Sequence, residues 1–476
     1  FCWPKPSRAP IRRTRFLRQV FHKGGPRMCI KENYVLKSGF DSNAFLSDMK
    51  AAKEAVGESG PADARHLEFL VGLARGFACM GYVLVILGAS QSFSLLPGIA
   101  CVAGAILIST GRCMRWVIIG HHVTHGGYDQ IHKNHPGVLS KHYKRGIFGT
   151  GWRRFIDWLD WMLPGAWDVE HNKMHHYYLS EDTDPDLVER NFAMLHTMPL
   201  PSFVKYASMV FWMFTWKATY YSPNTFKELE HSRKNTFAVR YWPQSRPKTE
   251  PLTVFDFAYL PFLHVLRGDF KGALFWPVFF IQWLLVVIPM MVLVVLPAAV
   301  PPALGVTGLW PFALEWQRAA LKTLVFSVAA DLLSNAHSFV IVACNHSGED
   351  LYRYSTSCKA YSAEWFLRCS YSSVNFETGN DFVDIFYGWL NYQIEHHMFP
   401  DMTPLQYRKL QPLVKSVCKK HGVQYIQQNG FWRTWKMLRC AVGDDKMVQC
   451  DAILPPKADD KKKAAAEVVR EGATGN

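Results

Sequence analysis

Two long stretches of this 476-residue chain lack charged side chains altogether. No Asp, Glu, Lys or Arg occurs from Gly76 to Gly111, a run of 36 residues, or from Gly272 to Leu314, a run of 43 residues. A helix of about 20 apolar residues is long enough to cross the hydrocarbon core of a bilayer. Runs of this length exclude an ordinary soluble fold and predict membrane-spanning helices.

The chain also lacks two kinds of motif. Its 11 cysteines include no CxxC pair, so we expect reduced cysteines that pack in the interior and no disulfide framework. No nucleic-acid-binding motif accompanies the excess of 53 Lys and Arg over 39 Asp and Glu. We therefore expect no nucleic-acid partner, and the basic excess favours anionic lipid headgroups and acidic proteins.

Four membrane spans in two hairpins are predicted, at residues 67–89, 95–118, 274–300 and 319–346. The stretch GASQSFSLLPG breaks the first uncharged run, and a Pro- and Gly-containing turn follows the third span. The fourth span contains Asp331, and a buried helix of a soluble protein is the alternative for it. The expected fold class is mainly α: an integral membrane protein with four transmembrane helices in two hairpins and interfacial helices.

Basic residues are distributed unevenly around these spans. Eighteen Lys and Arg lie between Gly126 and Lys271, whereas the turns within the two hairpins carry almost none. The positive-inside rule therefore places the middle segment on the cytosolic or matrix side of the membrane. Both termini are expected on that same side.

Histidines gather at points that this topology brings to one side of the membrane. HHVTH (121–125) follows the second span, HNKMHH (171–176) lies in the basic middle segment, and QIEHH (393–397) follows the fourth span, which His346 ends. In a helix, residues at i and i+4 share a face. The first two histidines of HNKMHH therefore align, and the third is expected about 100° further round.

So many imidazoles exceed the needs of one metal ion. Zinc takes about four ligands in tetrahedral geometry, so two metal ions are the simpler expectation. Imidazole without thiolate suits iron, copper, zinc or nickel alike. A single HxxxH pair can arise by chance in a His-rich chain, and the prediction depends on the three boxes occurring together.

The boxes HHVTH, HNKMHHYYLSEDTDPDL and GWLNYQIEHHMFPDM, in this order, resemble those of the membrane fatty acid desaturases. These enzymes have boxes of the HxxxH, HxxxHH and QxxHH type, and the resemblance extends from about residue 66 to residue 425. It implies four transmembrane helices and a helical cap on the cytosolic or matrix side, which holds a di-metal site of two iron ions. By position, the implied ligands are His121, His125, His171, His175, His176, His346, His396 and His397. Three further residues are expected as weaker ligands, as neighbours of ligands or along the substrate path: Gln393, His122 and His337.

The resemblance implies an O2-dependent reaction that inserts a double bond into the acyl chain of a membrane lipid. Members with Gln in the last box often carry a cytochrome b5 domain, which this chain replaces with a basic arm. An external donor, free cytochrome b5 or a ferredoxin, is therefore expected. Two alternatives keep the same boxes: a lipid hydroxylase or oxygenase, and a desaturase-like structural subunit of a large organellar membrane complex.

Three regions are expected: a basic N-terminal arm (1–65), a membrane desaturase-like domain (66–425) and a C-terminal extension with a low-complexity tail (426–476). Residues 1–30 hold eight Lys and Arg and no Asp or Glu, which is typical of an organellar targeting or processed N-terminus. We expect an organellar membrane, with the mitochondrial inner membrane favoured over plastid or endoplasmic reticulum.

Aromatic residues predict contacts with the membrane interface. The pattern of residues 151–171, GWRRFIDWLDWMLPGAWDVEH, predicts an interfacial amphipathic helix with Trp152, Trp158 and Trp161 near one face. These side chains are expected either to anchor the protein in the interface or to line a substrate tunnel. YASMVFWMFTW (206–216) is too short to cross a bilayer and is expected to lie on its surface.

Overall fold

The computed structural model describes residues 33–37, 39–92, 94–233, 249–252 and 310–455, with single residues between 256 and 269. The predicted third span at 274–300, the basic residues 1–30 and the tail after residue 455 lie outside this part of the chain. The described chain is mainly helical. The expected helical fold class is therefore confirmed at that level.

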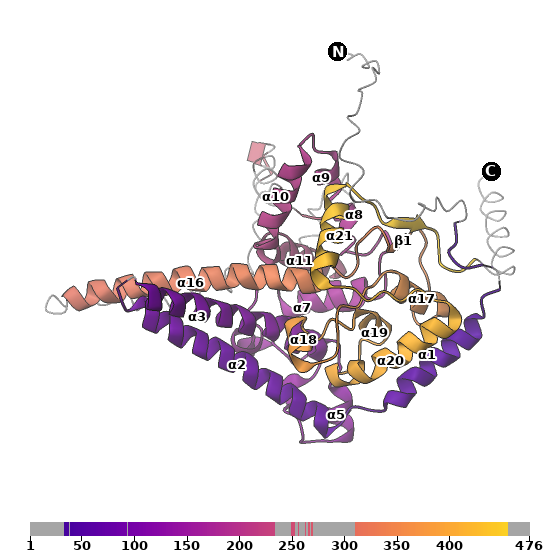
Figure 1. Ribbon diagram of the computed structural model, residues 1–476, viewed down its shortest axis with the longest axis horizontal. Helices are drawn as coiled ribbons and strands as arrows, with labels where there is room; N and C mark the ends of the chain where they lie inside the picture. Colours follow the sequence, from indigo (N-terminus) through magenta and orange to yellow (C-terminus); the bar gives the residue numbers. More distant parts are fainter. Residues whose placement is uncertain are drawn as a thin grey trace, which may run out of the picture.

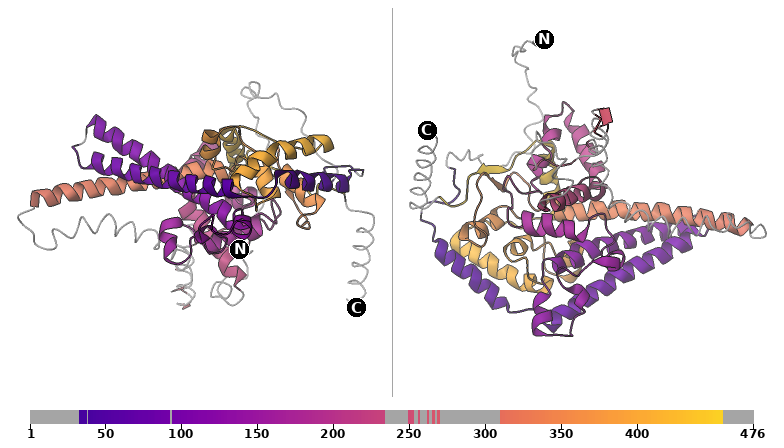
Figure 2. Two further views of the ribbon diagram at one scale, coloured as in Figure 1. Left: turned by 90° about the horizontal axis from the view of Figure 1, so that it is seen from below. Right: turned by 180° about the vertical axis from the view of Figure 1, so that it is seen from behind.

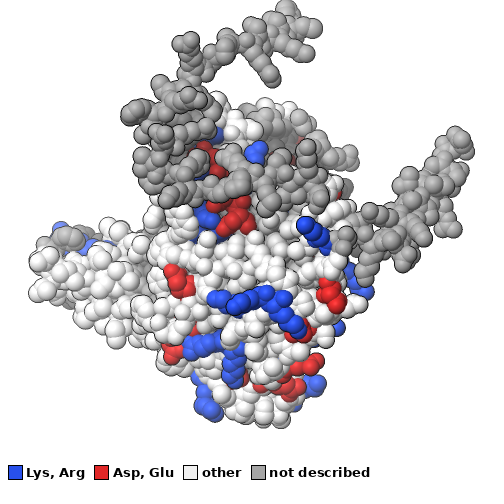
Figure 3. All heavy atoms as spheres, turned by 45° about the vertical axis from the view of Figure 1, so that its right-hand side comes forward, with Lys and Arg blue, Asp and Glu red and all other residues white. Residues whose placement is uncertain are grey.

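Three long helices project side by side from the rest of the molecule (Figures 1 and 2): α2 (Pro61–Ala89), α3 (Leu95–Cys113) and α16 (Trp310–Val342). All three are long and apolar enough to cross a membrane, and only 28–39% of each apolar window is buried. Figure 3 shows that they carry almost no charged side chains on the face in view, apart from basic groups near the tip. Helices are thus present where three of the four spans are predicted.

Two of these helix boundaries differ from the expected ones. The helix of α3 continues as a π-helix, η1 (Met114–Gly120), directly into α4 (His121–Thr124). The last span ends at Val342, so that His346 lies in the turn that follows. Both differences place histidines at the ends of the long helices, His121 directly after η1 and His346 in the turn after α16.

Glycines allow α2 and α3 to approach closely. A Cβ at Gly104 would lie 2.6 Å from the carbonyl oxygen of Gly81, and a Cβ at Gly81 would lie 2.7 Å from that of Gly104. Gly88 and Gly111, each seven residues further along its helix, face the neighbouring helix at similar distances. Small residues at helix crossings let backbones pack in the absence of a hydrophobic driving force.

Gly104→Leu should therefore force α2 and α3 apart. We expect it to lower the free energy of unfolding by about 1–3 kcal/mol, which is typical of overpacking, and to lower the thermal unfolding midpoint of the protein in detergent. Gly98→Leu is the matched control, because a Cβ at Gly98 in the same helix meets nothing within 4 Å. Equal shifts for both variants would show that the close approach is not important for stability.

Asp331 of α16 is paired with Arg112 of α3 and accepts a hydrogen bond from Trp161 in a loop. Arg112 Nη1 lies 3.3 Å from Asp331 Oδ1, and Trp161 Nε1 donates to Asp331 Oδ2 at 2.8 Å. Arg112 also donates to the hydroxyl of Tyr82 at 3.0 Å. Charged residues in membrane helices occur where they are paired, and this pairing explains how a carboxylate fits into an apolar span.

The predicted interfacial helix over residues 151–171 is wrong. The structure has short pieces instead: η3 (Gly151–Arg153), α6 (Arg154–Asp157), α7 (Pro164–Trp167) and η4 (Asp168–His175). Pro164 begins α7, and the preceding Leu163 is extended because proline disfavours the helical conformation of the residue before it.

This break changes the environments of the three tryptophans. Trp152 is 68% exposed, as an interface residue should be, but Trp158 is 1% exposed and donates to the Met162 carbonyl at 2.8 Å. Trp161 contacts Asp331 through its ring nitrogen. Trp158 is therefore a core residue and does not lie at an interface.

Shorter helices build the cap around the bases of the spans. They are α1 (Ser42–Val56), α5 (Asp129–Asn134), η2 (Lys141–Tyr143), α8 (Val188–Asn191), α9 (Ala193–Thr197), α10 (Ser202–Met213), η5 (Lys217–Tyr221), α11 (Ser222–Ser232), α17 (Ala363–Tyr371), α18 (Asp381–Phe386), α19 (Gln393–Met398), α20 (Pro404–His421) and α21 (Gly430–Val442). Two short strands, β1 (Tyr352–Tyr354) and β2 (Val448–Cys450), pair in parallel, with Tyr352 opposite Val448.

The segment expected as a C-terminal extension is part of this cap. Helix α21 packs against α10 and α16, and β2 pairs with β1. Helix α20 begins with a capping box between Thr403 and Gln406 and ends at Gly422 in the left-handed conformation. It packs against α1 and thereby closes the side of the cap that is remote from the spans (Figure 1).

Candidate metal centre

The second histidine box lies on a π-helix, which changes the direction of its side chains. In η4 the backbone N–H of His176 donates to the carbonyl of His171 at 3.2 Å, an i to i+5 bond. Such a bond places residue i+5 over residue i. The Nε2 atoms of His171 and His176 therefore lie only 3.3 Å apart, and the expected 100° divergence of His176 is wrong.

The eight histidines implied by the three boxes and His346 form two adjacent clusters. Within each cluster, the nitrogens that could bind a metal lie within 4.8 Å of one another. The first cluster contains His121, His125, His171, His176 and His396. The second contains His175, His346 and His397. The second and third boxes each contribute to both clusters.

Close nitrogen contacts define the first cluster. His121 Nε2 lies 2.8 Å from His396 Nε2 and 3.3 Å from His171 Nε2. His125 Nε2 is buried and has no hydrogen-bond partner in the described part of the chain. All five rings are almost fully buried, so protein groups or a bound cation must satisfy these nitrogens.

Gln393 joins the second cluster. Its side-chain nitrogen lies 2.8 Å from His346 Nε2 and 3.2 Å from His397 Nε2, and these two ring nitrogens are 3.1 Å apart. The two orientations of a side-chain amide differ little in shape. The Gln393 amide oxygen has no hydrogen-bond partner in the present orientation. If the amide were rotated by 180°, this oxygen would point between His346 Nε2 and His397 Nε2.

Hydrogen bonds on the far side of two rings decide which nitrogen carries the proton. His346 Nδ1 lies 3.0 Å from the carbonyl oxygen of Ser372, and His175 Nδ1 lies 2.9 Å from Asp184 Oδ1. Both acceptors require a protonated Nδ1, so the Nε2 atoms of these rings carry lone pairs when the imidazoles are neutral. Those lone pairs point into the second cluster.

Burial keeps most of the rings neutral. It lowers the pKa of His346 to about 3, and it lowers the pKa of His176 and of His397 well below the ordinary value. Burial also acts to lower the pKa of His175, but the Asp184 carboxylate reverses the effect and raises it. Convergent lone pairs at these short distances repel one another, and a cation between them would relieve this repulsion. The residues present therefore fit metal ions.

Two groups that support the rings were not identified from the sequence. Asp184 binds His175 and also accepts the backbone N–H groups of Ser180 at 2.7 Å and Asp186 at 2.9 Å. The hydroxyl of Tyr407 lies 3.1 Å from His396 Nδ1. The acid-rich stretch EDTDPD beside the second box could have indicated Asp184, whereas no local pattern distinguishes Tyr407.

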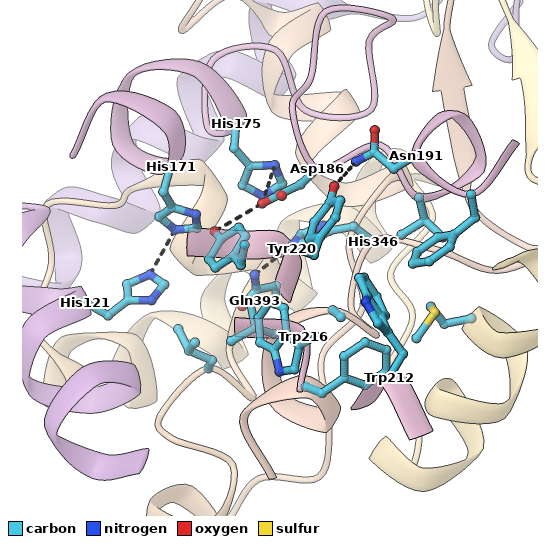
Figure 4. A pocket seen from close by; sticks show the side chains of 18 residues that line it. His121, His171, His175, Asp186, Asn191, Trp212, Trp216, Tyr220, His346 and Gln393 are labelled. Carbon is cyan, nitrogen blue, oxygen red and sulfur yellow. Dashed lines mark hydrogen bonds and ion pairs between the residues drawn. The ribbon is translucent and has the colours of Figure 1, made fainter. Parts of the chain in front are cut away.

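A pocket of about 660 Å³, which includes its open part, adjoins both clusters (Figure 4). His121, His171 and His175 lie at one end, with Gln393 between them and the aromatic wall. That wall includes Trp212, Trp216, Tyr220, Tyr221, Phe192 and Phe339. Asn191 donates to the hydroxyl of Tyr220 at 2.5 Å, and Asp186 adds a carboxylate to the lining.

Two of the remaining candidates lie apart from both clusters. His122 is buried, and its Nδ1 lies 2.7 Å from the carbonyl oxygen of Ile118 one turn earlier. His337 Nε2 lies 2.8 Å from the carbonyl oxygen of Phe386, and its ring packs on the Phe386 ring. Neither nitrogen belongs to the groups that converge among the described residues.

The family model for fatty acid desaturases matches residues 97–429, which contain all three histidine boxes. The chain belongs to the fatty acid desaturase family. The matched range contains both histidine clusters and most of the residues that line the pocket. No solved structure matches it.

Several curated relatives are similar to this chain over limited stretches. The acyl-lipid (9-3)-desaturase of Physcomitrium patens is 33% identical over 118 residues, 25% of this chain and 21% of the relative. The sn-1 linoleoyl-lipid 6-desaturase of Synechocystis is 38% identical over 66 residues, 14% of this chain and 18% of the relative. The fatty acid desaturase 2-like protein FADS2B of mouse is 60% identical over 47 residues, 10% of each. The matches thus cover about a fifth or less of these relatives.

Asp184→Asn should weaken metal binding, because it removes the charge that holds the tautomer of His175. Loss of such a supporting group costs about 10–100-fold in metal affinity, so metal content per chain, measured by inductively coupled plasma mass spectrometry after dialysis, should fall. Asp182→Asn is the control, because that carboxylate is largely exposed and pairs with Arg353 at 3.0 Å. Unchanged metal content in Asp184→Asn would contradict a supporting role.

Proposed function

We propose that this chain is an O2-dependent acyl-lipid desaturase that inserts a double bond with two iron ions. The observation that carries the proposal is the juxtaposition of two buried histidine clusters with an aromatic pocket. The eight clustered histidines are the proposed ligands, and Gln393 is proposed as a further donor to the second ion. The amide of Gln393 lies as close to His346 as the ring nitrogens lie to one another.

The iron ions would supply the redox chemistry that removes hydrogen from an unactivated methylene, which protein side chains cannot do alone. The protein contributes position and environment. Asp184 fixes the tautomer of His175, and the Ser372 carbonyl does the same for His346. The buried rings exclude water from the reacting region.

The aromatic pocket is the proposed binding site for the acyl chain. Trp216 is held by a hydrogen bond from its Nε1 to the Asn335 carbonyl at 2.9 Å, and its ring packs on Phe339 at a centroid distance of 5.7 Å. A wall fixed in this way would align a flexible hydrocarbon with the metals and would set the position of the double bond.

Several finer features complete the proposal. We propose an integral membrane protein with four spans in two hairpins, and a domain from about residue 66 to residue 425. Electrons would come from free cytochrome b5 or a ferredoxin, which the net basic charge of the chain favours. The mitochondrial inner membrane stays a prediction from the basic N-terminal residues.

The test combines metal content with the fatty acids of a host that expresses the protein. We expect about two iron ions per chain and a new unsaturated fatty acid, detected by gas chromatography with mass spectrometry. His176→Ala should lower the iron content and abolish the new species. His142→Ala is the matched control, because His142 is exposed and outside both clusters.

Other outcomes would favour the alternatives. A hydroxylated lipid in place of a new double bond would identify a hydroxylase of the same superfamily. An unchanged lipid profile, with iron-free protein found only in a large complex, would favour a structural subunit. Zinc in place of iron would contradict any O2-dependent redox reaction at this site.

A further inference from the structure

Helix α21 exposes aromatic side chains in its first turns and buries two basic side chains beside its apolar residues. Phe431 and Trp432 are 61% and 54% exposed, and Trp435 is also exposed. Arg433 and Lys436 are buried on the opposite face. Charged residues of these types are rarely buried unless they are paired, so a specific interaction must hold this face inward.

Asp350 supplies that interaction. Arg433 Nη1 lies 2.7 Å and 2.9 Å from the two carboxylate oxygens of Asp350, and Lys436 Nζ lies 2.7 Å from Oδ2. Arg433 also donates to the Ser347 carbonyl at 2.9 Å. This network fixes the rotation of α21 and leaves its aromatic side chains facing outward.

The outward residues continue onto α18. Phe382 is 80% exposed, and the Phe386 ring lies 6.4 Å from that of Phe431. We name these residues the aromatic edge: Phe382, Phe386, Phe431, Trp432 and Trp435. A contiguous exposed apolar surface of this kind marks a site of contact with a protein or a membrane.

The position of the aromatic edge relative to α16 favours a membrane. His337 of α16 lies 2.8 Å from the Phe386 carbonyl, and Leu333, four residues earlier, is among the exposed apolar residues of that span. Four residues of helix correspond to about 6 Å. The aromatic edge therefore lies next to the point where the exposed apolar residues of α16 end, which is where the headgroup region of a bilayer would begin.

Helix α10 extends the same surface. The Tyr206 ring of α10 stacks on Trp435 at a centroid distance of 5.2 Å, and Phe203 and Phe211 of α10 are exposed. Figure 1 shows α10 and α21 running across the direction of α16. Two helices that cross the span direction, with aromatic side chains outward, have the arrangement of helices that lie in a membrane interface.

We propose that the aromatic edge is a membrane-docking surface that sits at the boundary between headgroups and acyl chains of a phospholipid bilayer. It is continuous with the lipid-facing surface of α16, and a bilayer that surrounds the spans would reach it without any further partner. This proposal requires that the spans lie in a membrane, but it does not require desaturase activity.

The inner faces of the same helices line the pocket. Met437 of α21 and Trp212 of α10 are pocket residues, whereas Trp435 and Phe211 face outward on those helices. The docking surface and the pocket are thus opposite sides of one pair of helices. An acyl chain that remains attached to a membrane lipid would therefore have a short path to the metal centre.

Photo-crosslinking in phospholipid nanodiscs tests the proposal without an activity assay. p-Benzoylphenylalanine would replace Trp432, Val325 on the exposed face of α16 as a positive control, and Lys419 on the exposed face of α20 as a negative control. After irradiation and proteolysis, mass spectrometry should find lipid adducts at positions 432 and 325 but not at 419.

The result has clear contrary outcomes. Lipid adducts at 325 without adducts at 432 would overturn the docking surface, as would adducts at neither position. Crosslinks from 432 to a second copy of the chain, or to a co-purified protein, would assign the surface to that partner instead. Because the readout is chemical, an inactive protein that gives the expected adducts would refute the proposed function while supporting the docking surface.

Discussion

Crowding of buried imidazole nitrogens around two points is the constraint on which the rest of this structure depends. Eight buried rings, together with the amide of Gln393, direct their nitrogens at two points, with contacts of 2.8–3.3 Å. Neutral rings arranged in this way are poorly satisfied without cations. The ligands come from four separated segments of the chain, so two bound ions would tie the base of α3, the middle segment, the end of α16 and α19 into one unit.

Local backbone geometry directs histidines that are close in sequence to two different clusters. Adjacent residues in an α-helix point about 100° apart, and His396 and His397 use this difference to reach different clusters. The π-helix at η4 has the opposite effect on the second box, because its wider turn brings His176 back over His171 and leaves His175 for the other cluster. Single π-helical turns within α-helices occur frequently at functional sites.

Much of this arrangement can be predicted from the sequence, because absence of charge and spacing of histidines are local patterns. The uncharged run after Arg75 indicates two spans, and the boxes identify seven of the eight clustered histidines, with His346 added by the family resemblance. The π-helical hydrogen bonds cannot be predicted in this way, since they depend on how η4 packs against its neighbours. Tyr407 and Ser372 support ligands from distant positions and have no distinguishing local pattern.

The expected helix over residues 151–171 failed for an identifiable reason. Helix α6 ends at Asp157, and Leu163 before Pro164 is extended, so the segment is not one helix and Trp158 lies in the core. The segment after residue 425 was expected as a separate extension, whereas α21 packs against α10 and α16, and Asp350, far away in sequence, binds Arg433 and Lys436 of that helix. Contacts over such a distance leave no local pattern in the sequence.

The polar contacts of α16 give the membrane span a mechanical link to the site. Asp331 accepts a hydrogen bond from the ring nitrogen of Trp161. Asn335, one turn later, accepts the backbone N–H of Lys217 at 3.1 Å through its side chain and the ring N–H of Trp216, a pocket residue, through its backbone carbonyl. A bilayer thicker or thinner than the span changes the tilt of a helix. Tilt of α16 would displace the pocket wall and His346 together relative to the histidines on the other segments, so the thickness of the host membrane would act on the distance between the pocket wall and those histidines.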